Sequence, residues 1–334
     1  MREKLLNYIE NSFLNELVKK NTITDISFNG ENIFYQDNNL GRRKSNLKIS
    51  LNDASDFIRQ IANLSESQFS YASPVLDISV GRYRINATHG AITKFNNEKS
   101  LSFSIRIASL SPRIENPSDF LSSEGFTFLD RVIKNNISVV IGGKTGTGKT
   151  ELQKYLLSLV NTYGRIIAID NVSELESLRV NKDLDLTYWQ VNKDIKHGGF
   201  DDLIKNAVRN NPDWLVVAEA RGEEMSSVIN SAMSGHPIIT TIHSKDVESM
   251  PYRMARMALI NNKQEIFEDI IYTIKTHFPI YIYLGKKIVN GTIKRYVEAI
   301  GEYHNDKMNV IYDVNNGFNL KKLSKELKKE LGYE

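Results

Sequence analysis

The chain has 334 residues, which is long enough for two domains. Its residues are 41% hydrophobic and 25% charged, a composition that is ordinary for a globular protein. Its 43 basic and 40 acidic residues leave a formal charge of +3, so overall charge does not demand a polyanionic partner. The absence of cysteine excludes disulfides, thiol catalysis and cysteine-ligated zinc or iron–sulfur sites.

The first residues do not resemble a secretory or membrane-spanning segment. They place Leu6, Ile9, Phe13 and Leu17 at helical spacing among charges, which predicts an amphipathic helix. The sequence has no basic-then-apolar start and no run of about 18 apolar residues. We therefore expect a cytoplasmic protein, which could be peripheral on the inner face of the cell membrane.

Residues 1–108 have the pattern of a small N-terminal α/β domain. Two β-type runs, "ITDISF" and "NIFYQ", are joined by Asn29-Gly30, which favours a hairpin turn. A helix is predicted from Asn52 or Asp53, because apolar residues then recur on one side. Three more strands are predicted at "VLDISV", "RYRINAT" and "SLSFSIRI". Residues 109–117 break both periodicities with two prolines and are predicted to be an interdomain linker.

Residues 118–334 have a different pattern, in which helices alternate with apolar, β-branched runs. These runs are "ISVVIGG", "RIIAID", "DWLVVAEA", "PIITTIH" and "FPIYIYLG". Such an alternation predicts a mostly parallel sheet with helices on both faces. The tail spaces Leu320, Leu323, Leu327 and Leu331 three and four apart, which predicts an amphipathic, lysine-rich helix. Packing of this helix on the core is commoner than docking on a membrane or a partner.

The string "GGKTGTGKT" contains the spacing G-x-x-x-x-G-K-[ST], and it follows an apolar strand and precedes a helix. Backbone N–H groups of such a loop can point inward at a phosphate chain, beside the positive end of the helix dipole. Lys149 is predicted to reach the β- and γ-phosphates, and the Thr150 hydroxyl to bind Mg²⁺. The predicted nucleotide-binding residues are Gly143, Lys144, Thr145, Gly146, Thr147, Gly148, Lys149, Thr150 and Glu151.

A carboxylate for catalysis is predicted at Glu219, which ends the apolar run "DWLVVA". Strand ends are where doubly wound sheets bind ligands, and a carboxylate there can orient the attacking water. The alternative is a surface glutamate just past a strand. Many P-loop proteins have a magnesium-holding aspartate before this glutamate, but this chain has Ala218, so Asp170 and Glu174 are the candidates for that task.

His236 and His243 lie at the two ends of one predicted strand in "SGHPIITTIHS". A zinc site needs three or four protein ligands, whereas the other histidines are scattered and cysteine is absent. The histidines are therefore not expected to bind a metal, and no zinc is expected. Packing at the strand ends remains an alternative to a role at the nucleotide.

Four motifs in this order resemble the secretion ATPase superfamily, the hexameric ATPases of type II and type IV secretion, conjugation and pilus movement. They are the glycine-rich loop, an acidic "Asp box" at 165–175, a Walker B segment at 218–221, and a His box with Gly235-His236 and Thr241-Ile242-His243. "ITDISFNG", "GRYRIN" and "SFSIRI" resemble the N-terminal part more weakly. The lack of a tetracysteine zinc insertion favours the compact type IV secretion and conjugation branch, or the retraction-motor branch.

The resemblance implies a RecA-like P-loop NTPase fold for the C-terminal domain and roles for further residues. His243, and secondarily His236, would sense the γ-phosphate, and Arg221 would help position Glu219. Arg84 and Arg106 would approach the phosphates from the N-terminal domain at a domain or subunit boundary, although arginines alternating on a strand can also simply face water. The family's Glu-Asp pair is Asp170-Asn171 here, which implies slower turnover.

The resulting hypothesis is a ring-forming, most simply homohexameric, motor that hydrolyses ATP with Mg²⁺ and powers type IV secretion or conjugative transfer of DNA or protein. Its expected partners are further copies of the chain and membrane-embedded channel components, with DNA contact left open. The alternatives are a pilus retraction or assembly motor, a DNA translocase or helicase, and a nucleotide-gated assembly scaffold with little hydrolysis.

Overall fold

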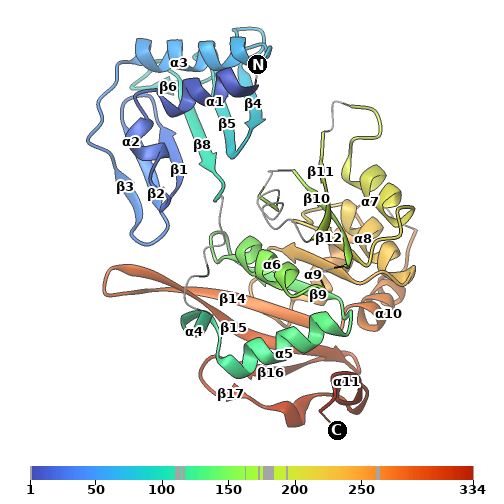
Figure 1. The fold of residues 1–334 in the computed structure, drawn as a ribbon. Helices are drawn as coiled ribbons and strands as arrows, with labels where there is room; N and C mark the ends of the chain where they lie inside the picture. The colour runs from blue at the N-terminus through green and yellow to red at the C-terminus, as the bar shows by residue number, and fades with distance from the viewer. Residues whose placement is uncertain are drawn as a thin grey trace. The chain divides into compact units, whose positions relative to one another are not determined.

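The structure, a computed structural model, describes residues 2–109, 114, 117–161, 163–171, 174–175, 184–192, 195–260 and 264–333. The chain forms two compact units (Figure 1). The N-terminal unit comprises Met1–Ser111, Val172–Glu174 and Ile288–Lys294, and the C-terminal unit comprises Pro112–Asn171, Leu175–Lys287 and Arg295–Glu334. Most of the predicted linker 109–117 lies outside the described residues, and the predicted domain boundaries remain predictions.

The N-terminal unit is an antiparallel sheet with strand order β3-β2-β1-β8-β5-β4, packed against helices. Its helices are α1 (Arg2–Glu10), α2 (Asn15–Val18) and α3 (Leu51–Leu64), and its strands are β1 (Ile23–Phe28), β2 (Ile33–Asp37), β3 (Gly41–Lys44), β4 (Val75–Val80), β5 (Tyr83–Thr88), β6 (Lys94–Phe95), β7 (Glu98–Lys99) and β8 (Ser102–Ile107). Helix α3 begins one or two residues before the predicted start, because Ser50 and Asp53 form a reciprocal capping box.

The predicted N-terminal helix is divided into α1 and α2. The Ser12 hydroxyl donates to the Ile9 carbonyl at 2.7 Å and accepts from the Leu14 N–H at 3.2 Å. A serine that bonds nearby backbone groups in this way competes with the helical hydrogen bonds. Ile9 and Leu17 are nevertheless both buried, so the apolar spacing correctly identified core residues.

The C-terminal unit contains a nine-stranded sheet with the order β11-β10-β12-β13-β9-β14-β15-β16-β17. The first six strands in this order, β11, β10, β12, β13, β9 and β14, pair in parallel. Strands β15, β16 and β17 extend the sheet by antiparallel pairing. The strands are β9 (Val139–Gly143), β10 (Arg165–Asp170), β11 (Asp185–Gln190), β12 (Trp214–Val217), β13 (Ile238–Ile242), β14 (Ile280–Val289), β15 (Thr292–His304), β16 (Lys307–Asp313) and β17 (Gly317–Phe318).

Successive residues of the parallel strands enter two different cores. Val139 and Ile141 of β9 pack with the helices on one face, whereas Val140 packs with those on the other. The first face is covered by α5 (Ser123–Lys134) and α6 (Lys149–Ser158), and the second by α7 (Phe200–Val208), α8 (Glu224–Met233), α9 (Met250–Ala258) and α10 (Phe267–His277). A short helix, α4 (Pro117–Phe120), precedes α5. The predicted parallel α/β sheet is confirmed, whereas β11 and β15 to β17 were not predicted.

The prediction of one helix for the lysine-rich tail is wrong. The tail forms a 3-10 turn, η2 (Leu320–Lys322), followed by a short helix, α11 (Lys325–Glu330). Ser324 divides them, because its hydroxyl caps α11 and its backbone N–H donates to the buried Glu302 carboxylate at 2.7 Å. Leu323, Leu327 and Leu331 are buried in the main core, so the tail packs on the unit. Across the described ranges, no helix combines the length and apolar character needed to cross a membrane.

Candidate functional site

The glycine-rich loop connects the end of β9 to the start of α6. Gly146 (φ +75°) and Gly148 (φ +96°) adopt left-handed backbone conformations that other residues rarely adopt, which explains two of the glycines. Thr147 is buried, and its hydroxyl donates to the Lys144 carbonyl at 2.8 Å, bracing the loop from inside. Helix α6 begins without a side-chain cap at Gly148, so backbone N–H groups of its first turn remain available to an anion.

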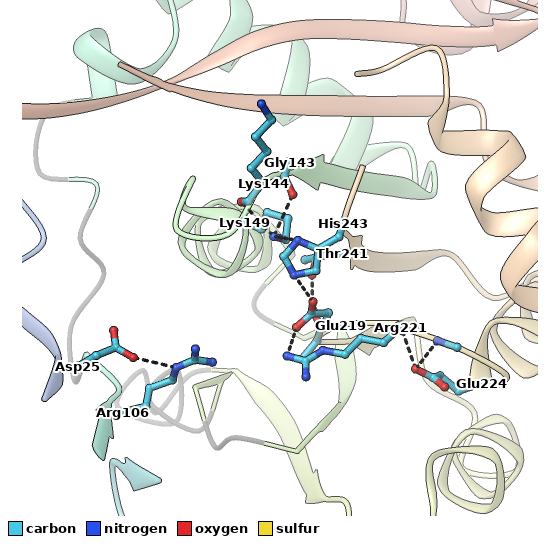
Figure 2. A network of polar contacts seen from close by, with 12 residues as sticks. Asp25, Arg106, Gly143, Lys144, Lys149, Glu219, Arg221, Glu224, Thr241 and His243 are labelled. Carbon is cyan, nitrogen blue, oxygen red and sulfur yellow. Dashed lines mark hydrogen bonds and ion pairs between the residues drawn. The ribbon is translucent and has the colours of Figure 1, made fainter. Parts of the chain in front are cut away.

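Lys149 points back into the loop. Its side chain is buried, and its Nζ donates to the carbonyls of Gly143 at 3.2 Å and Lys144 at 3.4 Å. The same Nζ lies 3.4 Å from Nδ1 of His243, the residue that follows β13 (Figure 2). Because β13 pairs in parallel with β9, its carboxyl end meets the loop at one edge of the sheet. His243, which was predicted to lie near the γ-phosphate, thus contacts the lysine of the loop, while its role there remains a prediction.

Glu219 lies at the same edge, two residues beyond β12, with its side chain 18% exposed. Its Oε2 accepts a hydrogen bond from the Arg221 guanidinium at 2.6 Å, and its Oε1 lies 2.8 Å from His243 Nε2. Burial by itself raises the pKa of Glu219, but hydrogen bonding and charge from Arg221, with the charges of His243 and Lys149, outweigh it and lower the pKa below its ordinary value. The carboxylate is therefore ionised at neutral pH.

His243 is held neutral between two charged groups. Burial first, and the charge of Lys149 second, lower its pKa, while Glu219 acts in the opposite direction. On one side of the ring Nδ1 lies 3.4 Å from Lys149 Nζ, and on the other side Nε2 faces Glu219. The contact between Nε2 and Glu219 Oε1 is short but not aligned as a hydrogen bond, and Oε1 is buried with no other donor among the described residues. Oε1 can therefore accept a hydrogen bond from water.

This pKa shift predicts a pH-dependent stability. The pKa of His243 in the folded protein lies below its ordinary value of 6.5, so the unfolded chain binds a proton on this residue more readily than the folded protein does. The stability that neutral His243 contributes to the fold is therefore fully present above pH 6.5. It is lost as the pH falls through the pKa of His243 in the folded protein. We expect His243→Asn to reduce the fall in Tm between about pH 7.5 and pH 5.5. The exposed His197 provides a control variant, His197→Asn, which should keep the wild-type slope. Equal slopes of Tm against pH in wild type, His243→Asn and His197→Asn would contradict the assignment of this pH dependence to His243.

Side chains outside the predicted set hold this edge of the sheet together. The Gln153 amide on α6 donates to the carbonyls of Val217 at 3.2 Å and Ile239 at 3.4 Å, which joins the helix to β12 and β13. The buried Thr241 hydroxyl donates to the Ala218 carbonyl at 2.8 Å. Gln153 falls just after the loop motif, but no spacing rule identifies its strand partners, which lie far away in the sequence.

Glu224, in the first turn of α8, fixes the backbone of the segment that carries Arg221. Its Oε1 accepts from the backbone N–H groups of Arg221 at 2.6 Å and Gly222 at 3.2 Å (Figure 2). Glu224 is thus a support for Arg221 that the prediction missed. An acidic residue in a first helical turn is a common signal, but it does not reveal such a contact.

The structure does not bring His236 to the loop. It precedes β13, at the opposite end of the strand from His243, and its Nδ1 lies 3.0 Å from the Pro212 carbonyl. Asp170 ends β10 at the expected edge, where it is buried and accepts from the Leu175 N–H at 3.3 Å, but β12 and β13 separate β10 from β9. Glu151 forms an ion pair with the buried Lys154 at 3.2 Å along α6.

The predicted arginines belong to the N-terminal unit, where both form ion pairs. Arg84 contacts Asp77 through two nitrogens, at 3.2 and 3.0 Å, and Arg106 contacts Asp25 at 3.3 Å. Arg84 and Arg106 are direct partners across β5 and β8 and so share one face of that sheet. Glu174 groups with the same unit. The approach of these residues to a nucleotide remains a prediction.

The site fits Mg²⁺ only as an ion that is held largely by phosphate and water. The described residues contain no group of three or more His, Asp or Glu side chains arranged for a metal. The Thr150 hydroxyl, at the start of α6, and the orphaned Oε1 of Glu219 are oxygen donors of the type that Mg²⁺ and its waters prefer. Magnesium that retains several waters and bridges phosphates needs no more protein ligands than these.

A parallel sheet covered on both faces, with a glycine-rich loop leading into a helix and a carboxylate on a neighbouring strand end, defines a RecA-like P-loop α/β protein. Comparison with known proteins narrows the class. The family described as "Type II/IV secretion system protein" matches residues 118–276. These residues therefore carry a domain of the secretion ATPase superfamily, and type IV secretion proteins are among the relatives of the chain.

Two relatives show the extent of the likeness in sequence. An uncharacterised protein of Bacillus anthracis is 28% identical over 87% of this chain and 67% of its own length. The type IV secretion system protein VirB11 of Bartonella quintana is 33% identical over 38% of this chain and 34% of its own length. Because the chain spans only about a third of the length of VirB11, the activity and partners of a whole secretion protein are matters for proposal.

Solved structures agree with the fold. The match to the ATPase DotB of Legionella pneumophila covers 88% of this chain and 80% of the DotB chain, with 18% sequence identity and a TM-score of 0.61. The pilus retraction motor PilT with bound ADP, also 18% identical, covers 86% and 80% with a TM-score of 0.60. At this identity the likeness concerns the fold alone, and it supports the predicted RecA-like class.

Proposed function

We propose that the protein hydrolyses ATP with Mg²⁺. The observation that carries the proposal is the continuous chain of contacts from the P-loop lysine to the strand-end carboxylate, Lys149 to His243 to Glu219 to Arg221. A loop that binds phosphate and a carboxylate that orients water are the two parts that phosphoryl transfer to water requires, and here they are joined by one imidazole.

The proposed reaction assigns each side chain a separate task. Loop N–H groups and Lys149 bind the β- and γ-phosphates, and Mg²⁺ held with the help of the Thr150 hydroxyl would neutralise the charge that develops on them. Glu219 is ionised and accepts a hydrogen bond from the attacking water through Oε1, while Arg221 fixes the other oxygen. His243 contacts both Lys149 and Glu219, so a shift of Lys149 towards the γ-phosphate alters the surroundings of Glu219.

The wider proposal is a ring, most simply a homohexamer, that powers type IV secretion or conjugative transfer beside a membrane channel. It is supported by the secretion family and by the VirB11 relatives. In such a ring, Arg84 or Arg106 would exchange its aspartate partner for a phosphate at a domain or subunit boundary. An arginine supplied in this way makes hydrolysis depend on assembly.

The test is steady-state hydrolysis of Mg²⁺-ATP as a function of protein concentration, with mass measured in parallel. We expect turnover per subunit to rise as the protein assembles, and Arg106→Ala to reduce the assembled rate by about 10-fold or more while leaving the mass unchanged. The matched control is the exposed Arg59→Ala, in the same unit. If nucleotide promotes ring formation but no ATP is hydrolysed, the proposed ATPase activity is overturned, and the protein is better described as a nucleotide-gated assembly scaffold.

A further inference from the structure

Two cations from the far end of the chain contact the glycine-rich loop. Lys286 on β14 donates from Nζ to the Thr145 carbonyl at 2.8 Å, and Arg295 on β15 donates from Nε to the Gly146 carbonyl at 2.8 Å. The strands that carry them are neighbours in the sheet, and β14 pairs directly with β9, the strand that leads into the loop. The same part of the sheet therefore supports both the loop and the two side chains that contact it.

Each contact also fixes the peptide group to which the carbonyl belongs. In a planar trans peptide, the C=O of one residue and the N–H of the next point in opposite directions. When Lys286 and Arg295 hold the oxygens of Thr145 and Gly146, the N–H groups of Gly146 and Thr147 are turned away from the two cations. Loop N–H groups turned to one side form the anion-binding concavity of a P-loop.

The loop needs such support because of its own composition. Residues 144–146 are exposed, and glycines lose more conformational freedom on ordering than any other residue. The two cations lie beside these glycines: a Cβ at Gly146 would lie 3.4 Å from Lys286 Nζ, and one at Gly148 would lie 3.6 Å from Arg295 Cδ. Lys286 and Arg295 thus lie within van der Waals distance of the loop, which stays exposed at residues 144–146.

We propose that Lys286 and Arg295 are positioning residues that preset the loop amides for phosphate and thereby raise nucleotide affinity. The affinity part rests on the proposed nucleotide site, whereas the ordering of the loop does not. A charged donor on each carbonyl is stronger than a neutral one, and preorganisation lowers the entropy lost on binding. Replacing either cation by methionine keeps most of the packing volume and removes the donor.

The first measurement is millisecond amide hydrogen exchange of residues 144–148 in nucleotide-free protein. We expect Lys286→Met and Arg295→Met each to accelerate exchange there about fivefold, the effect of losing one hydrogen bond of typical net strength at an exposed site. Lys286→Arg and Arg295→Lys should restore slow exchange, because each still donates. The control is Lys287→Met, since Lys287 is the next residue on β14 and lies over the Tyr296 ring instead of the loop.

The second measurement is KM for Mg²⁺-ATP together with Kd for ADP. Each methionine variant is expected to raise both about fivefold, with kcat changed by less than about twofold, because the catalytic side chains are untouched. Wild-type exchange and affinity in both variants, or equal losses in Lys287→Met, would overturn the proposal. If wild type binds no nucleotide, the proposed function fails, and the exchange result still decides whether the cations order the loop.

Discussion

Replacing Glu219 by glutamine is expected to lower ATP turnover by about 10²- to 10³-fold, while ADP affinity changes by less than about threefold. Glutamine keeps the shape of the side chain, and its oxygen can still accept from Arg221. It lacks the negative charge that Arg221 and His243 surround, so the attacking water loses its acceptor. Single-turnover hydrolysis and ADP binding would separate the chemical step from binding.

A matched control for this variant is Glu248→Gln, an exposed glutamate in the segment that follows β13. It should leave turnover and affinity at wild-type values. Turnover in Glu219→Gln within about threefold of wild type would remove Glu219 from the catalytic role. In that case the scaffold would become the better account of the site.

Lys149→Met is expected to weaken ATP and ADP binding by about 10- to 100-fold and to reduce turnover by at least 100-fold. The ammonium group is the positive charge that lies deepest in the loop, and the phosphates would lose both its charge and its hydrogen bonds. The exposed Lys245→Met, two residues beyond His243, is the control for charge near the site. Tm of both variants should be measured, because Lys149 is buried.

Two outcomes would contradict this expectation. Wild-type affinity in Lys149→Met with a folded protein would mean that the glycine-rich loop is not the nucleotide site. Equal losses in Lys245→Met would mean that the effect comes from overall charge at this edge of the sheet and not from a contact with phosphate, and raised salt should then weaken binding in all three proteins.

Sequence alone determined the loop and the carboxylate because their signals are local. The spacing from Gly143 to Thr150 requires a strand before it and a helix after it, and the structure has both. Apolar, β-branched runs correctly predicted β9, β10, β12, β13 and β14, since a strand buried on both faces is apolar over most of its length. Strand β11 and the antiparallel strands β15 to β17 were missed, because their half-exposed residues lack such a run.

Tertiary structure decided which residues meet at the site. The sequence favoured His243 over His236 but left both as candidates, and parallel pairing of β13 with β9 brings only the carboxyl end of the strand, and therefore His243, to the loop. Lys286 and Arg295 have no sequence signal at all, because 141 and 149 residues separate them from the carbonyls that they contact. Hydrogen bonds between distant segments follow from sheet order, and sheet order is a property of the folded chain as a whole.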